Sequence, residues 1–113
     1  VPLHLELDEY DLNSTHFVAY DGDTPFGAGR IRIAEPHVGK VERVCILPEY
    51  RGKHLGNLMM DCMEKYALDH QFKKLKLNAQ SQALPFYEKR GYTITSPEFL
   101  EANIPHRAME KEL

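Results

Sequence analysis

A basic turn in the middle of the chain combines residue types that can bind an anion. Its two cations supply positive charge, and its two glycines let the backbone come close to a ligand. An apolar helical pattern begins inside the turn, so the free N–H groups and the dipole of a helix start point outward there. The turn therefore predicts a site for phosphate groups. Its members are Arg51, Gly52, Lys53, His54, Leu55, Gly56 and Asn57.

Other phosphate-binding motifs fit this turn less well. It lacks the Gly-Lys-Ser/Thr ending of a Walker-type loop. No βαβ unit with a suitably placed acid accompanies it, which disfavours a dinucleotide-binding fold. A plain strand–turn–helix connection without a ligand is the remaining alternative.

A second group of residues lies further along the chain. Phe86 and Tyr87 form an aromatic pair, and Gly91 and Tyr92 follow within one short segment. Packing in the core is the alternative to a role in ligand binding for these rings.

Together the two segments resemble the signatures of the GNAT N-acetyltransferases. The pattern Arg51-x-x-His54-x-Gly56 is similar to the acetyl-CoA pyrophosphate loop of that family, Gln/Arg-x-x-Gly-x-Gly/Ala. His54 stands where the family has its middle glycine, at a position expected to need positive φ. The resemblance runs from about Phe17 to the end of the chain, and Ile-Pro-His at 104–106 is similar to the ElaA-like and YjcF-like branch.

The resemblance implies an enzyme that moves acetyl from acetyl-CoA directly to a primary amine, in a small molecule or peptide, in a ternary complex without a metal. Tyr87 matches the tyrosine that protonates the leaving thiolate, so Phe86 should face the core and Tyr87 the cofactor. The pantetheine arm would pair with the backbone of a strand end, and Gln80 or Asn78 would bond it. The implied cofactor-binding residues are Val44, Cys45, Ile46, Arg51, Gly52, Lys53, His54, Leu55, Gly56, Asn57, Asn78, Gln80 and Tyr87.

Two residues are candidates for the general base, with water-mediated proton removal as the third alternative. Glu42 lies two residues before Val44, on the same face if the strand is regular. His106 belongs to a residue type that titrates near neutral pH. The other histidines, at positions 4, 16, 37 and 70, show no metal-ligand spacing.

The composition indicates one small domain over residues 1–113. The 42% apolar content is ordinary for a globular protein, and the net charge of −3 disfavours nucleic acid as a partner. No stretch is long and apolar enough for a membrane span. Cys45 and Cys62 are expected to be reduced packing residues of a cytoplasmic protein. Because the chain begins with Val, we expect it to be incomplete at the N-terminus and to lack the family's first strand and helix.

The hydrophobic pattern predicts a mixed sheet with helices, an α/β or α+β domain in the order β-β-β-α-β-α-β-β. Residues 1–11 are expected to form an acidic connector. The predicted strands are 15–20, 26–33, 38–46, 74–78, 92–95 and 106–111, and the predicted helices run from 55 to about 69 and from about 81 to Gly91, with a loop over 96–105.

Three further expectations concern packing. Three consecutive apolar residues predict a strand end that is covered on both faces: Val44, Cys45 and Ile46. The sulfur-containing side chains of the long helix are predicted to fill the core: Met59, Met60, Cys62 and Met63. The resemblance implies that the cofactor occupies a slot between the strands that end at Ile46 and Asn78.

The sequence indicates the amine that accepts the acetyl group less closely than it indicates the cofactor. The acidic residues from Glu6 to Asp11 favour a cationic acceptor such as a polyamine, an aminoglycoside or lysine. Two alternatives to an enzyme are a non-catalytic acyl-CoA-binding domain and a structural dimerisation module that forms a homodimer through an exposed sheet edge.

Overall fold

The computed structural model describes residues 3–11, 13–52 and 54–113. None of the helices in these ranges is long and apolar enough to cross a membrane. The strands are β1 (Leu3–Asp11), β2 (Ser14–Asp21), β3 (Thr24–Glu35), β4 (Val38–Ile46), β5 (Lys74–Gln80), β6 (Thr93–Ile94), β7 (Phe99–Glu101) and β8 (Ile104–Glu112). The helices are α1 (Leu55–Asp69) and α2 (Leu84–Lys89), with short 3-10 turns at Pro48–Tyr50 and Ser81–Ala83.

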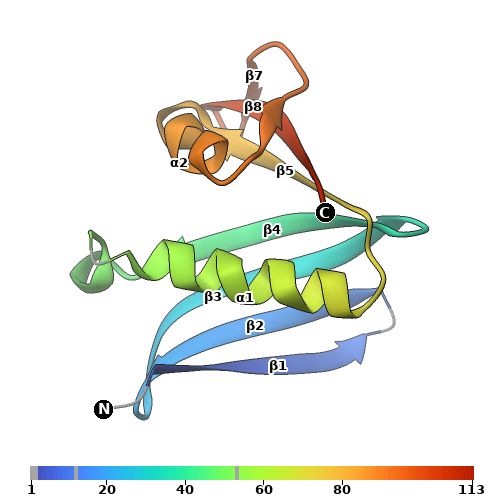
Figure 1. Ribbon diagram of the computed structural model, residues 1–113. Coiled ribbons are helices and arrows are strands. Elements are labelled where there is room, and N and C mark those ends of the chain that lie inside the picture. The colour runs from blue at the N-terminus through green and yellow to red at the C-terminus, as the bar shows by residue number, and fades with distance from the viewer. Residues whose placement is uncertain (1–2, 12, 53) are drawn as a thin grey trace.

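The strands form one mixed sheet, which confirms the predicted fold class. Its order is β1-β2-β3-β4-β5-β8-β6, with β7 paired to β8. The β4–β5 pair is parallel and the other pairs are antiparallel. Helix α1 runs across one face of β2, β3 and β4, while β5, β8 and α2 form a second group beyond β4 (Figure 1).

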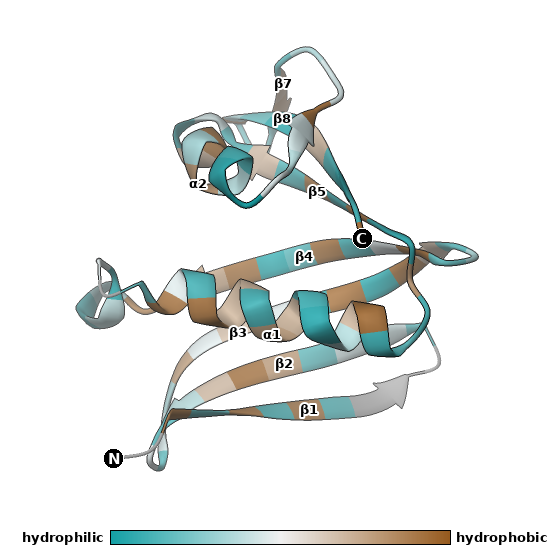
Figure 2. Ribbon diagram, in the orientation of Figure 1, coloured by the Kyte–Doolittle hydropathy of each residue, from teal (hydrophilic) through white to brown (hydrophobic). Residues whose placement is uncertain are grey.

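Helix α1 supplies the centre of the core. Met59, Met60 and Met63 are almost fully buried, as predicted, but Cys62 is exposed. The helix buries the stripe that continues through Ala67 and leaves Leu58 half exposed, because it contacts the sheet on one side only. Its apolar and hydrophilic stripes alternate in Figure 2.

Two glycines in β3 allow this helix to lie close to the sheet. A Cβ atom at Gly29 would approach the Sδ of Met63 to 3.0 Å, and one at Gly27 would approach the Sδ of Met59 to 3.4 Å. A side chain at either position would therefore collide with the methionines of α1 or force the helix away from β3.

Strand β1 corrects the prediction of an acidic connector. It pairs antiparallel with β2, and Leu5 lies opposite Ala19 and packs against the core. Leu3 and Leu7 remain about half exposed, at 49% and 50%. An edge strand tolerates acidic residues because one of its sides and much of its surface meet water. Val1 and Pro2 lie outside the described residues.

Strand β7 corrects the prediction of a loop over 96–105. It pairs with β8 through a two-residue turn at Ala102 and Asn103, whose φ angles are 51° and 63°. Such turns need positive φ at both positions and usually contain glycine. The absence of glycine here hid the hairpin from the sequence pattern.

The parallel strands β4 and β5 separate along most of their length. They pair only over Val38–Lys40 and Lys74–Lys76, which lie at one end of both strands. This confirms the predicted slot. It also corrects the expectation that Val44, Cys45 and Ile46 are covered on both faces: Cys45 is exposed, because α1 covers only the opposite face of β4.

Candidate functional site

The basic turn forms the wall of a cavity of about 310 Å³ at the start of α1. We call it the loop cavity. All the described members of the predicted anion-binding turn line it, together with Ile46, Tyr50 and Phe86. Lys53, which was also predicted to bind the cofactor, lies outside the described residues.

The backbone of this turn has the geometry expected of an anion site. His54 precedes α1 with φ 60° and ψ 17°, so the left-handed conformation predicted for the glycine position is confirmed. Its side chain makes no capping hydrogen bond to the helix. The first amides of α1 therefore point away from the helix without intrahelical partners. Arg51 fixes the other side of the turn by donating its Nε–H to the carbonyl of Ile46 at 3.1 Å.

A second cavity, of about 520 Å³, lies where β4 and β5 separate. We call it the splay cavity. The three candidate catalytic residues, Tyr87, Glu42 and His106, all line it. The remaining lining residues are Arg30, Lys40, Val41, Arg43, Val44, Leu77, Asn78, Ala79, Gln80, Ala83 and Glu101.

The two cavities follow one another along β4. Val44 lines the splay cavity and Ile46 lines the loop cavity, two residues further on. An elongated ligand with phosphates at one end could therefore lie along this strand end.

A bulge in β4 changes the orientation of Glu42. Arg43 has φ 58°, and the register with β3 shifts between Ala28 and Arg30. Glu42 lies opposite Arg30 and Cys45 lies opposite Ala28, so these two β4 residues share a face. The expectation that Glu42 shares a face with Val44 is therefore wrong, because the strand is not regular.

The Glu42 carboxylate is fully occupied by cations. Arg30 and Arg32 donate hydrogen bonds to it, with Arg32 Nε at 3.2 Å, and Lys40 Nζ lies at 3.9 Å. Burial raises the pKa of the Glu42 carboxyl, but the hydrogen bonds from Arg32 and Arg30 outweigh burial and hold that pKa below its ordinary value. The lowered pKa makes the Glu42 carboxylate a weak proton acceptor.

His106 lies on the opposite wall in a defined orientation. Its Nδ1 lies 2.7 Å from the carbonyl oxygen of Ile104, which can only accept, so Nδ1 carries the hydrogen. Nε2 is then the basic nitrogen, and it lies 3.6 Å from a carboxylate oxygen of Glu101. Asn78 donates its amide to the other oxygen of Glu101 at 3.2 Å.

Tyr87 is held between two aromatic rings on the same side of the cavity. Phe86 and Tyr92 contact it edge-on, with ring centroids 5.0 Å and 5.6 Å away. Burial raises the pKa of the Tyr87 hydroxyl, and the charge of Arg90 opposes this only in part. The phenol is therefore protonated at neutral pH. Phe86 packs against the core, as expected, but it also lines the loop cavity.

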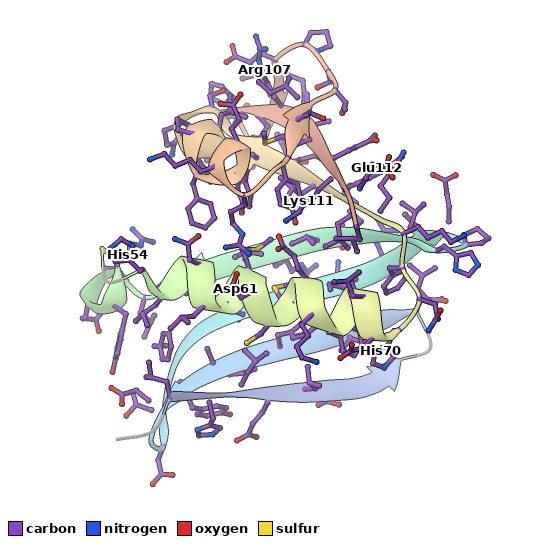
Figure 3. All side chains as sticks on the ribbon, in the orientation of Figure 1. His54, Asp61, His70, Arg107, Lys111 and Glu112 are labelled. Carbon is purple, nitrogen blue, oxygen red and sulfur yellow. The ribbon has the colours of Figure 1, made fainter. Side chains whose placement is uncertain are left out.

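A buried polar cluster joins α1 to the group formed by α2 and β8. Glu64 accepts hydrogen bonds from Arg90 at 2.8 Å, Tyr92 at 2.9 Å and Lys111 at 3.1 Å. Arg90 also donates to the Oδ1 of Asn57, in the loop cavity, at 2.9 Å. Lys111 extends from β8 toward α1 in Figure 3. The cluster therefore spans the slot between β4 and β5 on the α1 side.

The structure gathers most of the predicted site residues into these two cavities. Cys45 lines neither of them. Sequence reasoning missed Arg43 and Glu101: the bulge that presents Arg43 has no sequence signal, and Glu101 lies in the segment predicted as a loop. Within ranges 3–11, 13–52 and 54–113, no group of three or more His, Cys, Asp or Glu residues could hold a metal ion.

A sheet split between parallel strands, with a glycine-containing turn at the start of the adjoining helix, is the arrangement of the acyl-CoA N-acyltransferase fold. Solved structures confirm it. A GNAT family acetyltransferase from Elizabethkingia anophelis, with acetyl-CoA bound, matches 98% of this chain and 98% of its own with a TM-score of 0.84 at 11% identity. Escherichia coli ElaA matches 92% of this chain and 75% of its own with a TM-score of 0.81 at 21% identity.

Sequence comparison gives the family. Residues 5–113 match the family described as acetyltransferase (GNAT) domain. The Bacillus subtilis protein YjcF, described as an uncharacterized N-acetyltransferase, is 46% identical over 113 residues, which cover 99% of this chain and 80% of YjcF. The chain therefore belongs to the GNAT acetyltransferase family, and its similarity to YjcF agrees with the branch indicated by residues 104–106.

Proposed function

We propose that this protein transfers acetyl from acetyl-CoA directly to a primary amine of a small molecule or peptide, in a ternary complex. The observation that carries the proposal is the succession of the two cavities along β4. The loop cavity offers helix amides and Arg51 to phosphates, and the splay cavity holds acid–base side chains. A bound acetyl-CoA in the Elizabethkingia relative supports the same cosubstrate here.

The residues present suit such a cosubstrate. Its pyrophosphate would meet the amides of Leu55, Gly56 and Asn57, because these groups have no intrahelical acceptor. Its amide chain would pair with the backbone of Val44–Ile46, on the side of β4 from which β5 has separated. Gln80 and Asn78 line the facing wall and carry amide groups that could bond the same chain.

The reaction needs one group that accepts a proton and one that gives a proton. The amine nitrogen attacks the thioester carbonyl carbon, and the carbon–sulfur bond breaks. His106 accepts a proton from the amine through Nε2, and Tyr87 gives its proton to the leaving thiolate. We assign the base to His106 in preference to Glu42, since the cations around Glu42 lower its pKa.

Two measurements test the proposal. Calorimetry with acetyl-CoA tests binding, and a thiol-release assay with a panel of amines tests transfer. We expect binding in the micromolar range and release of free thiol only when a suitable amine is present. Absence of binding at hundreds of micromolar acetyl-CoA contradicts the proposal, and binding without thiol release on any amine favours a non-catalytic acyl-CoA-binding domain.

A further inference from the structure

The β3–β4 wall of the splay cavity carries more positive than negative charge. Arg30, Lys40 and Arg43 line this wall together with one carboxylate, Glu42. Arg30 and Lys40 both lie close to that carboxylate, which balances one positive charge. Arg32 does not line the cavity but reaches the same carboxylate, so Glu42 has no charge left to balance Arg43.

Arg43 differs from its neighbours because its charge is unpaired. Among the residues that the structure describes, its side chain makes no hydrogen bond and no ion pair, and it is exposed while lining the cavity. Its backbone has φ 58°, a conformation that is costly for a residue with a side chain. The bulge thus places a free guanidinium at the cavity instead of directing it along the regular strand face.

The opposite wall has a different character. Glu101 is held by Asn78 and faces Nε2 of His106, and Tyr87 completes this side. A carboxylate beside a histidine suits an ammonium group that must lose a proton. The acidic residues that favoured a cationic acceptor do not reach this cavity: Glu6 and Asp8 lie on β1, and β2 and β3 separate them from β4.

We propose that Arg43 forms an anion subsite, so that the acceptor is an amine carrying a carboxylate or a phosphate. The amine meets the His106–Glu101 wall and the anionic group meets the Arg43 wall. Arginine suits this role because its planar fork donates two hydrogen bonds to either anion. The inference rests on the proposed acetyl transfer and adds the class of acceptor.

The test compares acceptors that differ in the anionic group. One pair is γ-aminobutyrate and its amide γ-aminobutyramide, and the other is phosphoethanolamine and ethanolamine. We expect the wild-type protein to favour the anionic member of at least one pair by about tenfold in kcat/KM, the size of one charge-assisted contact. The pair with the larger ratio identifies carboxylate or phosphate as the anion.

Variants of Arg43 test whether this residue causes the preference for anionic amines. Arg43→Gln should reduce the ratio to about twofold or less, whereas Arg43→Lys should keep most of it because the charge remains. Arg107→Gln is the matched control. Arg107 lies on β8 and does not line the splay cavity. Figure 3 shows it on the part of the molecule that is far from α1. Arg107→Gln should show the same ratio of kcat/KM values within each amine pair as the wild-type protein.

Calorimetry with the same amine pairs separates this proposal from the proposed function. If no amine is acetylated, the proposed function fails, and the affinities of the paired amines still report the anion preference. Equal affinity and equal kcat/KM within both pairs overturn the anion subsite. A ratio that is the same in wild type and Arg43→Gln overturns the role of Arg43.

Discussion

At the scale of single residues, the Tyr87 hydroxyl can be tested separately from its ring. Tyr87→Phe removes the hydroxyl and keeps the ring contacts with Phe86 and Tyr92. If Tyr87 is the acid, we expect transfer to slow by about 100-fold, within the usual range for general acid catalysis, with acetyl-CoA affinity nearly unchanged. Thiol-release kinetics and calorimetry measure the two quantities.

The control for this variant is Tyr20→Phe. Tyr20 lies on β2, stacks on His4 and lines neither cavity. Its loss of a hydroxyl should leave the rate unchanged. A Tyr87→Phe variant as fast as wild type would show that another group protonates the thiolate.

His54 poses a second question at this scale, because it occupies a left-handed backbone position at the start of α1. His54→Gly removes both the Cβ strain and the ring beside the expected phosphates. We expect acetyl-CoA to bind severalfold more tightly, as measured by calorimetry.

His54→Ala is the matched comparison for the glycine variant. It removes the ring but keeps the Cβ atom in the left-handed region, so it should gain less affinity than glycine does. Weaker binding by both variants would mean that the imidazole itself contributes to holding the phosphates.

At the scale of elements, Glu64 holds α1 against α2 and β8. Glu64→Gln keeps the shape of the side chain but removes the charge that faces Arg90 and Lys111. We expect the free energy of unfolding to fall by about 2 kcal/mol, because two cations lose their buried counterion. Urea denaturation measures the change.

Asp61→Asn provides the comparison. Asp61 lies 2.7 Å from the same guanidinium, but its side chain is 63% exposed. Removing the Asp61 charge should lower the free energy of unfolding by less than about 0.5 kcal/mol, since water screens exposed ion pairs. Equal losses for the two variants would contradict the special role of the buried carboxylate.

The sequence predicted those elements whose pattern is local. The periodicity after Leu55 located α1, and the resemblance carried by the two signatures indicated the slot between β4 and β5. What it missed depends on tertiary contacts. Cys62 has an apolar neighbourhood in sequence but lies on the water-facing side of α1. The bulge at Arg43 arises from pairing with β3, and no feature of the residue itself indicates positive φ.

At the scale of the whole molecule, the sheet consists of two groups that share one hydrophobic core but pair through only a short stretch of strand. The short β4–β5 pairing joins them at one end, and the Glu64 cluster joins them on the α1 side. A ligand that fills the slot would add contacts to both groups and should therefore stabilise the fold.

Thermal unfolding tests this consequence. Acetyl-CoA at 100 times its dissociation constant should add about 2.7 kcal/mol of stability, which raises Tm by roughly 10 °C for a domain of this size. Tyr87→Phe should show the same shift, because the proposal assigns the hydroxyl to transfer and not to binding. A Tm that does not respond to acetyl-CoA would contradict binding in the slot.

The separation of β4 from β5 also has a consequence for the exchange of backbone hydrogens with solvent. β4 still pairs with β3 and β5 still pairs with β8, but the amides on their facing sides have no strand partner beyond Lys40 and Lys76. In the free protein the slot-facing amides of residues 41–46 and 77–80 should exchange with deuterium quickly. Acetyl-CoA should protect them selectively, and the set of protected amides would trace the path of the bound chain residue by residue.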